Sequence, residues 1–171
     1  NTPNYKKLIP GFDSFEAIAF RGYEVYLTIE IKFPDSMSCF IARGHIDAQT
    51  LDITIPEQNL TQINVPIYID NMSYESLIVD KDRIIALFEA NGDSLIKSPY
   101  AISINSSGND IFKYQTSSIN YRIADATRVD KNNRFWAINY FFPGDRETLK
   151  PGDDILASKY GEGLTHSKSE R

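Results

Sequence analysis

The stretch at residues 14–20 (SFEAIAF) recurs 59 residues later at residues 73–79 (SYESLIV). Both copies have the order serine, aromatic residue, glutamate, small residue and aliphatic residue. The agreement continues at the same spacing, because residues 25–30 (VYLTIE) align with residues 84–89 (IIALFE). Self-similarity at a fixed period is typical of repeat architectures.

A third and weaker copy follows after a further 50 residues, with Asp125 in place of the glutamate and a second strand at residues 135–138 (FWAI). A fourth copy begins at residues 169–171 (SER), where Glu170 follows Asp125 by 45 residues. One unit is thus a strand with a carboxylate near its start, a turn of about five residues and a second strand.

Units of four strands at a spacing of about 45 to 60 residues are typical of the blades of a β-propeller. We therefore predict an all-β fold with about three blades of an expected total of about six. The repeats cover approximately residues 12–70, 71–120 and 121–168, and a fourth starts at residue 169. A β-sandwich or an open barrel is the main alternative.

The helix signal is poor, whereas short β-rich runs bounded by Gly, Pro, Asn, Asp and Ser recur along the chain. These runs predict strands at residues 15–20, 24–31, 39–45, 51–55, 74–79, 83–89, 100–104, 110–116, 121–129 and 134–142. The short connections between them indicate an antiparallel meander.

Composition excludes several classes of protein. The 171 residues include 18 Lys and Arg against 23 Asp and Glu, a net charge of −5, which argues against a nucleic-acid surface. The longest apolar run, residues 84–88, is too short for a membrane span. Cys39 is the single cysteine, so no internal disulfide forms. The chain starts at Asn1 without Met, which favours a processed leader or a trimmed chain. We expect an extracytoplasmic (periplasmic or secreted) location.

Residues 11–20 together with residues 25–30 resemble the first blade of the esterase-like phytase group of β-propeller proteins. The most specific segment is residues 121–127 (YRIADAT) leading into residues 134–145 (RFWAINYFFPGD). Residues 160–166 (YGEGLTH), with Glu170 and Arg171, are similar to a linker that enters the next blade. The resemblance covers about the N-terminal half of such a propeller and implies a hydrolase acting on ester or phosphoester bonds.

The repeated carboxylates are the candidate metal ligands. In a propeller the first strand of each blade lines the central channel, so Glu16, Glu75, Asp125 and Glu170 would point at one axis. Carboxylates that converge repel one another unless a cation lies between them, and Ca²⁺ prefers oxygen ligands. Two alternatives stay open, because each acid can instead bind backbone amides of the neighbouring blade or act as a catalytic acid or base.

Arg122 and His166 are the candidate catalytic residues. Arg122 is either a surface arginine or an anion clamp at the channel mouth, since regular alternation places it and Asp125 on opposite faces of a strand. His166 lies in the Gly-rich entry to the fourth unit. Glu30 and Glu89 end the second strands of the first two units and are either part of an acidic funnel or solvated strand ends.

Because no complete nucleophile–base set is present, the sequence favours a β-propeller binding or scaffold module with a metal or another ligand in its channel. The alternative is a metal-assisted phosphoesterase or related esterase of the esterase-like phytase type, in which the metal activates water. A third hypothesis is a structural half-propeller completed by a partner chain or by remaining blades, because open strand edges invite pairing. A small-molecule or phosphoester ligand is an expected partner.

Overall fold

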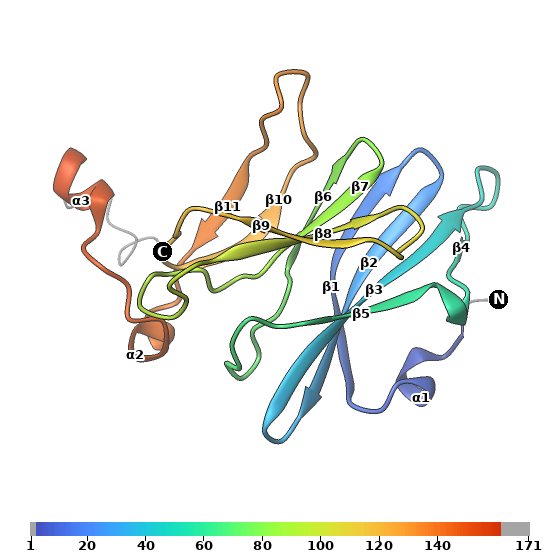
Figure 1. Cartoon of the computed structure of the whole chain (residues 1–171), viewed down its shortest axis with the longest axis horizontal. Coiled ribbons are helices and arrows are strands. Elements are labelled where there is room, and N and C mark those ends of the chain that lie inside the picture. The colour runs from blue at the N-terminus through green and yellow to red at the C-terminus, as the bar shows by residue number, and fades with distance from the viewer. Residues whose placement is uncertain (1–2, 162–171) are drawn as a thin grey trace.

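Three antiparallel β-sheets follow one another along the chain, of which the computed structural model describes residues 3–161 (Figure 1). The first sheet contains β1 (Phe12–Arg21), β2 (Glu24–Phe33), β3 (Ser36–Ile46), β4 (Ile53–Thr54) and β5 (Leu60–Asn64). The second contains β6 (Ser76–Asp80), β7 (Arg83–Leu87), β8 (Tyr100–Asn105) and β9 (Ile111–Gln115). The third contains β10 (Arg122–Ala126) and β11 (Ala137–Tyr140). The prediction of an all-β, antiparallel fold is confirmed.

Short helices complete the described chain: α1 (Tyr5–Leu8), η1 (Glu57–Asn59), η2 (Pro143–Asp145), α2 (Arg146–Leu149) and α3 (Ile155–Tyr160). None of the helices between residues 3 and 161 has the length and apolar character needed to cross a lipid bilayer.

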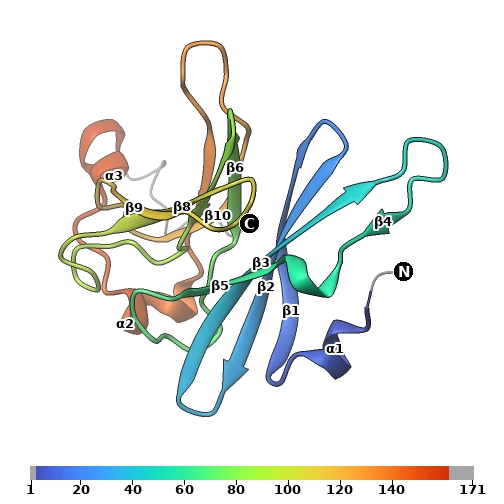
Figure 2. The same ribbon diagram turned by 45° about the vertical axis from the view of Figure 1, so that its right-hand side comes forward.

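The first strands of the three sheets lie next to one another. β1 contacts β6, and β6 contacts β10, while the later strands of each sheet extend away from them (Figures 1 and 2). Over residues 3–161 the sheets stay open and do not close into a ring. The β-propeller stays a prediction.

The sequence of β2 explains why the first sheet is covered on both faces. Successive side chains of a strand point to opposite faces. Tyr26 faces the second sheet, whereas Val25 and Ile29 face the side of α1, and all three are buried. β2 is linked to β1 by a two-residue turn in which Gly22 has a φ of 61°, a conformation that glycine adopts without steric cost.

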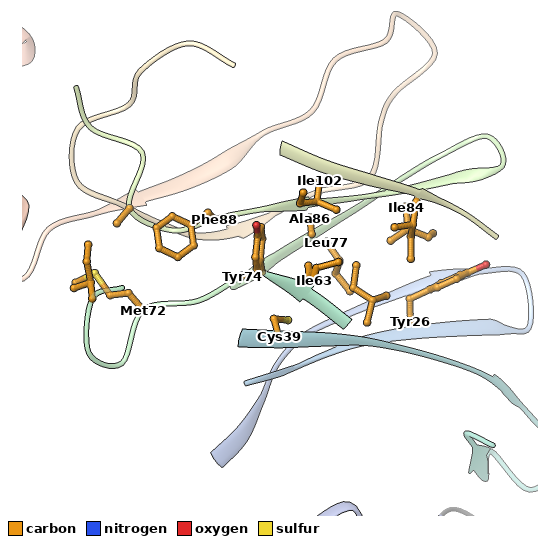
Figure 3. Packing of buried hydrophobic residues seen from close by; sticks show 14 of the residues in the cluster. Tyr26, Cys39, Ile63, Met72, Tyr74, Leu77, Ile84, Ala86, Phe88 and Ile102 are labelled. Atoms are coloured by element: carbon orange, nitrogen blue, oxygen red, sulfur yellow. The ribbon is translucent and has the colours of Figure 1, made fainter. Parts of the chain in front are cut away.

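The largest core lies between the first and second sheets (Figure 3). The rings of Tyr74 and Phe88 meet edge to face at 5.7 Å between centroids, and the Tyr74 hydroxyl donates to the Asn64 carbonyl at 3.0 Å. Cys39 is fully buried in this core, and burial raises the pKa of its thiol to about 12. The thiol is therefore protonated and packs as an apolar side chain.

The third sheet differs from the other two because it has only two strands within the described residues. Ile123 packs against the second sheet, in a small core with Ile78 and Leu87. Every second residue from just before β11 to just after it is apolar and exposed. These residues, which we call the exposed stripe, are Trp136, Ile138, Tyr140 and Phe142. A sheet face of this kind is typical of one that another layer covers.

Candidate functional site

Glu16 lies in an irregular part of β1. The register with β2 shifts on both sides of Phe15, and the Ala17 amide donates to the Thr28 hydroxyl at 2.8 Å instead of to a backbone carbonyl. Glu16 is half-buried, and its carboxylate accepts a hydrogen bond from the Ser14 hydroxyl. The irregular strand thus holds a half-buried carboxylate close enough to Glu30 of β2 to affect its pKa.

Glu30 on β2 is the acidic partner of Glu16. Its side chain lies opposite Cys39 in the β2–β3 register, so it faces the second sheet, and the residue is only 3% exposed. Burial, followed by the nearby charges of Glu16 and Asp13, raises the pKa of Glu30 to about 7. Asp13, Glu16 and Glu30 form a group that we call the first acidic cluster.

Little positive charge balances the first acidic cluster. Lys32 is the cation that lowers the pKa of Glu30, but its ammonium group pairs with Asp70 at 2.7 Å. The Lys32 side chain is 35% exposed, so solvent weakens its effect on the buried carboxyl. The first acidic cluster therefore carries an excess of negative charge whenever Glu30 is ionised.

A second acidic cluster, Glu75, Glu89 and Asp145, surrounds Arg122. Glu75 directly precedes β6, and Glu89 follows β7 by two residues, so the two meet across the ends of neighbouring strands. The Arg122 Nη2 donates to Glu75 Oε1 at 2.8 Å, and its Nε donates to Glu89 Oε2. Its Nη1 lies 3.5 Å from Asp145 Oδ2. All three guanidinium nitrogens thus face carboxylates.

Glu89 is the deepest of these acids and is fully buried. Its other oxygen accepts the Ser73 amide at 2.8 Å. Burial and the charge of Glu75 raise the pKa of Glu89, while Arg122 and the Ser73 amide act in the opposite direction. The Arg122 guanidinium lies between the Glu75 and Glu89 carboxylates and interacts with both. Its positive charge stabilises the two acids between the second and third sheets.

The two clusters are repeats of one arrangement with one difference. Glu30 follows Glu16 by 14 residues, and Glu89 follows Glu75 by the same number. Arg122 comes from the unit after Glu75 and Glu89. The equivalent position for the first cluster, 50 residues earlier in the chain, is Met72, which is buried. In the alignment of the units, a neutral thioether therefore takes the sequence position of the Arg122 guanidinium.

The predicted site residues are only partly brought together. Glu16 and Glu75 each join a cluster, and Arg122 joins that of Glu75, with its side chain 17% exposed, so the surface-arginine hypothesis is wrong. Asp125 is exposed, and its Oδ1 accepts the Ala126 amide at 2.7 Å. A register shift between Ile123 and Asp125 separates it from the regular alternation of β10. His166 and Glu170 lie outside the described residues.

Sequence reasoning underestimated Glu30 and Glu89, for which solvated strand ends had been one hypothesis. That hypothesis is wrong, because both are buried. Their constant 14-residue spacing from Glu16 and Glu75 is the signal that could have paired them. Asp13 and Asp145 were not singled out, because only the three-dimensional fold brings them to the other acids.

Within residues 3–161 no group of three or more His, Cys, Asp or Glu side chains is arranged to hold a metal ion. The carboxylate oxygens of the first acidic cluster are nevertheless of the type that Ca²⁺ prefers. A calcium site therefore stays a prediction.

Comparison with known proteins adds no relative. A scan against protein-family models found no match, and searches of curated proteins and of solved structures found none either. The resemblance to esterase-like phytases therefore stays a prediction, and the function has to be argued from the residues themselves.

Proposed function

We propose that this chain is a non-catalytic binding module whose first acidic cluster takes a positively charged group. The observation that carries the proposal is the buried Glu30 carboxyl, which lies beside Glu16 and Asp13 while the nearby Lys32 is paired with Asp70. A buried carboxylate without a cation is costly, and a bound cation would offset that cost.

The second acidic cluster supports this reading from within the same molecule. There, Glu75 and Glu89 receive Arg122 from the following unit. The first cluster has Met72 at that position, so its positive charge would come from a ligand. Ca²⁺ is the cation we favour, because it accepts several carboxylate oxygens in flexible geometry. We expect an affinity of about 10⁻⁴–10⁻³ M, the range typical of extracellular calcium modules.

We also propose that the three sheets are successive units of an incomplete β-propeller. Two features support this. The first strands β1, β6 and β10 lie side by side, and each of the first two sheets extends outward from its first strand as an antiparallel meander. The exposed stripe at Trp136, Ile138, Tyr140 and Phe142 is the face on which a further unit, from this protein or from a partner chain, would pack.

The hydrolase alternative has less support in the geometry. A phosphate clamp at Arg122 would need free guanidinium donors. All three nitrogens of Arg122 already face Glu75, Glu89 and Asp145. An incoming phosphate would have to displace at least one carboxylate and would meet the negative charge of the others. This arrangement favours a structural role for Arg122.

Calorimetric titration with CaCl₂ at pH 7.5 tests the proposed site. We expect saturable binding by the wild type and a loss of affinity of at least about tenfold in Glu30→Gln and in Glu16→Gln, because each loses one anionic ligand. Glu147→Gln, an exposed glutamate on α2, is the matched control and should bind like the wild type. Equal binding by all four proteins, or none by the wild type, would remove the site. Metal-dependent turnover of a phosphoester would instead favour the hydrolase.

A further inference from the structure

A cavity of about 380 Å³ lies on the other face of the first sheet, away from both acidic clusters. Its walls come from three strands, β2, β3 and β5, from the end of α1 and from the segment that follows it. The apolar side chains that line it are Leu8, Ile9, Ile31, Phe33, Phe40 and Leu60. Figure 2 shows α1 on the side of this sheet that is turned away from the second sheet. The volume falls within the range of small-molecule sites.

The wall formed by the N-terminal segment is fixed in place. The Tyr5 hydroxyl donates to the Ile55 carbonyl at 2.8 Å, and the Lys32 amide donates to the Gly11 carbonyl at 2.8 Å. Gly11 has a φ of 76°, and a Cβ there would come within 2.9 Å of the Phe33 ring and the Lys32 carbonyl. The chain can therefore lie against Phe33 only with glycine at this position. The cavity is pre-formed, which lowers the entropic cost of binding.

One anionic group borders this apolar cavity. Glu57 at the start of η1 lines it and is exposed, and among residues 3–161 no cation pairs with its carboxylate. The Glu57 charge also acts on Tyr5 of α1, where burial and then Glu57 raise the pKa of the phenol to about 12. Ser38 and Gln62 are the polar neighbours, joined by a hydrogen bond of 3.4 Å from Gln62 Nε2 to Ser38 Oγ.

We propose that this cavity binds a small hydrophobic amine. The apolar part of the ligand would lie against Phe33, Phe40 and Leu60, and its ammonium group would pair with Glu57 at the rim. Charge complementarity selects this class, because a carboxylate beside an apolar pocket attracts a cation and repels an anion of the same shape.

Three probes of similar shape and different charge test the proposal by NMR titration of the full chain at pH 7.5: 2-phenylethylammonium, 2-phenylethanol and 3-phenylpropanoate. We expect the ammonium compound to bind about two- to fivefold more tightly than the alcohol, the range of a solvent-exposed ion pair, and the carboxylate to bind most weakly. Shifts should centre on Phe33, Phe40 and Leu60. Binding of none of the three, or equal binding of all three, would overturn the proposal.

Two variants separate the role of charge from that of the apolar walls. In Glu57→Gln the preference for the ammonium compound over the alcohol should fall to about one, while the affinity for the alcohol stays unchanged. Leu60→Trp should fill the cavity and weaken all three probes. Glu147→Gln is the control and should keep the wild-type preference. A preference that survives in Glu57→Gln would contradict the assignment even if Leu60→Trp fails to fold.

Discussion

The variant Arg122→Met removes the cation that pairs with Glu75, Glu89 and Asp145. Methionine is the chosen replacement because Met72 is buried at the equivalent position of the preceding unit. Removing one partner of a buried ion pair costs about 3–5 kcal/mol. We expect about 3 kcal/mol at pH 7.5, the lower end of that range, because Glu89 is fully buried whereas Glu75 and Asp145 are 18% and 19% exposed.

Urea denaturation followed by circular dichroism measures this loss. With a denaturant dependence of about 3 kcal/mol per M for a chain of this size, the midpoint should fall by about 1 M. The loss should shrink as the pH is lowered toward 4.5, because burial raises the pKa of Glu89, which then takes up a proton and no longer needs a cation. Adding Glu89→Gln to Arg122→Met should restore part of the stability at pH 7.5.

The matched control is Arg134→Met. Arg134 is 70% exposed and pairs with Asp130 on the surface, so its loss should cost no more than about 1 kcal/mol. Equal midpoints for Arg122→Met and Arg134→Met would refute the view that Arg122 stabilises a buried acidic pair.

Three further results are expected. The pKa of Glu30 is about 7 in the folded chain against an ordinary 4.5, so the folded state binds more protons than the unfolded state. The free energy of unfolding should therefore be highest below pH 4.5 and fall by about 3 kcal/mol as the pH rises through 7. Denaturation of Glu30→Gln should show a flatter pH profile. Gly108→Ala should lower the free energy of unfolding by about 1–3 kcal/mol, because Gly108 has a φ of 76° and a Cβ would come within 2.7 Å of the Arg43 guanidinium. An unchanged urea midpoint would contradict this prediction. Trp136 is the single tryptophan and is 82% exposed, so its fluorescence should show no blue shift relative to the unfolded chain. A blue shift that grows with protein concentration would mean that another copy of the chain covers the exposed stripe around Trp136.

Much of the fold follows from local pattern. The runs at residues 24–31, 83–89 and 100–104 overlap β2, β7 and β8. Their nearly continuous apolar residues fit strands that are buried on both faces. β5 was not predicted, since its sequence LTQIN is mostly polar and it is a strand through its pairing with β3. The predicted strand at residues 51–55 is reduced to Ile53–Thr54.

The candidate site was harder to predict than the fold. A carboxylate near the start of each unit identified Glu16 and Glu75, but the same pattern placed Asp125 in the site, where the register shift of β10 leaves it exposed. The positions of Asp13 and Asp145 depend on how distant segments meet. Periodicity carries no information about these two contacts, so Asp13 and Asp145 are found only from the fold, whereas the 14-residue spacing could have paired the glutamates.

The central claim is that the first acidic cluster binds a cation, and an NMR titration of the ¹⁵N-labelled chain with CaCl₂ at pH 7.5 tests it most directly. We predict saturable amide shifts centred on Asp13, Glu16 and Glu30, which disappear in Glu30→Gln and weaken at pH 5.5, where Glu30 is protonated. Shifts that do not saturate, or that spread over exposed acids such as Asp93 and Asp153, would contradict the claim.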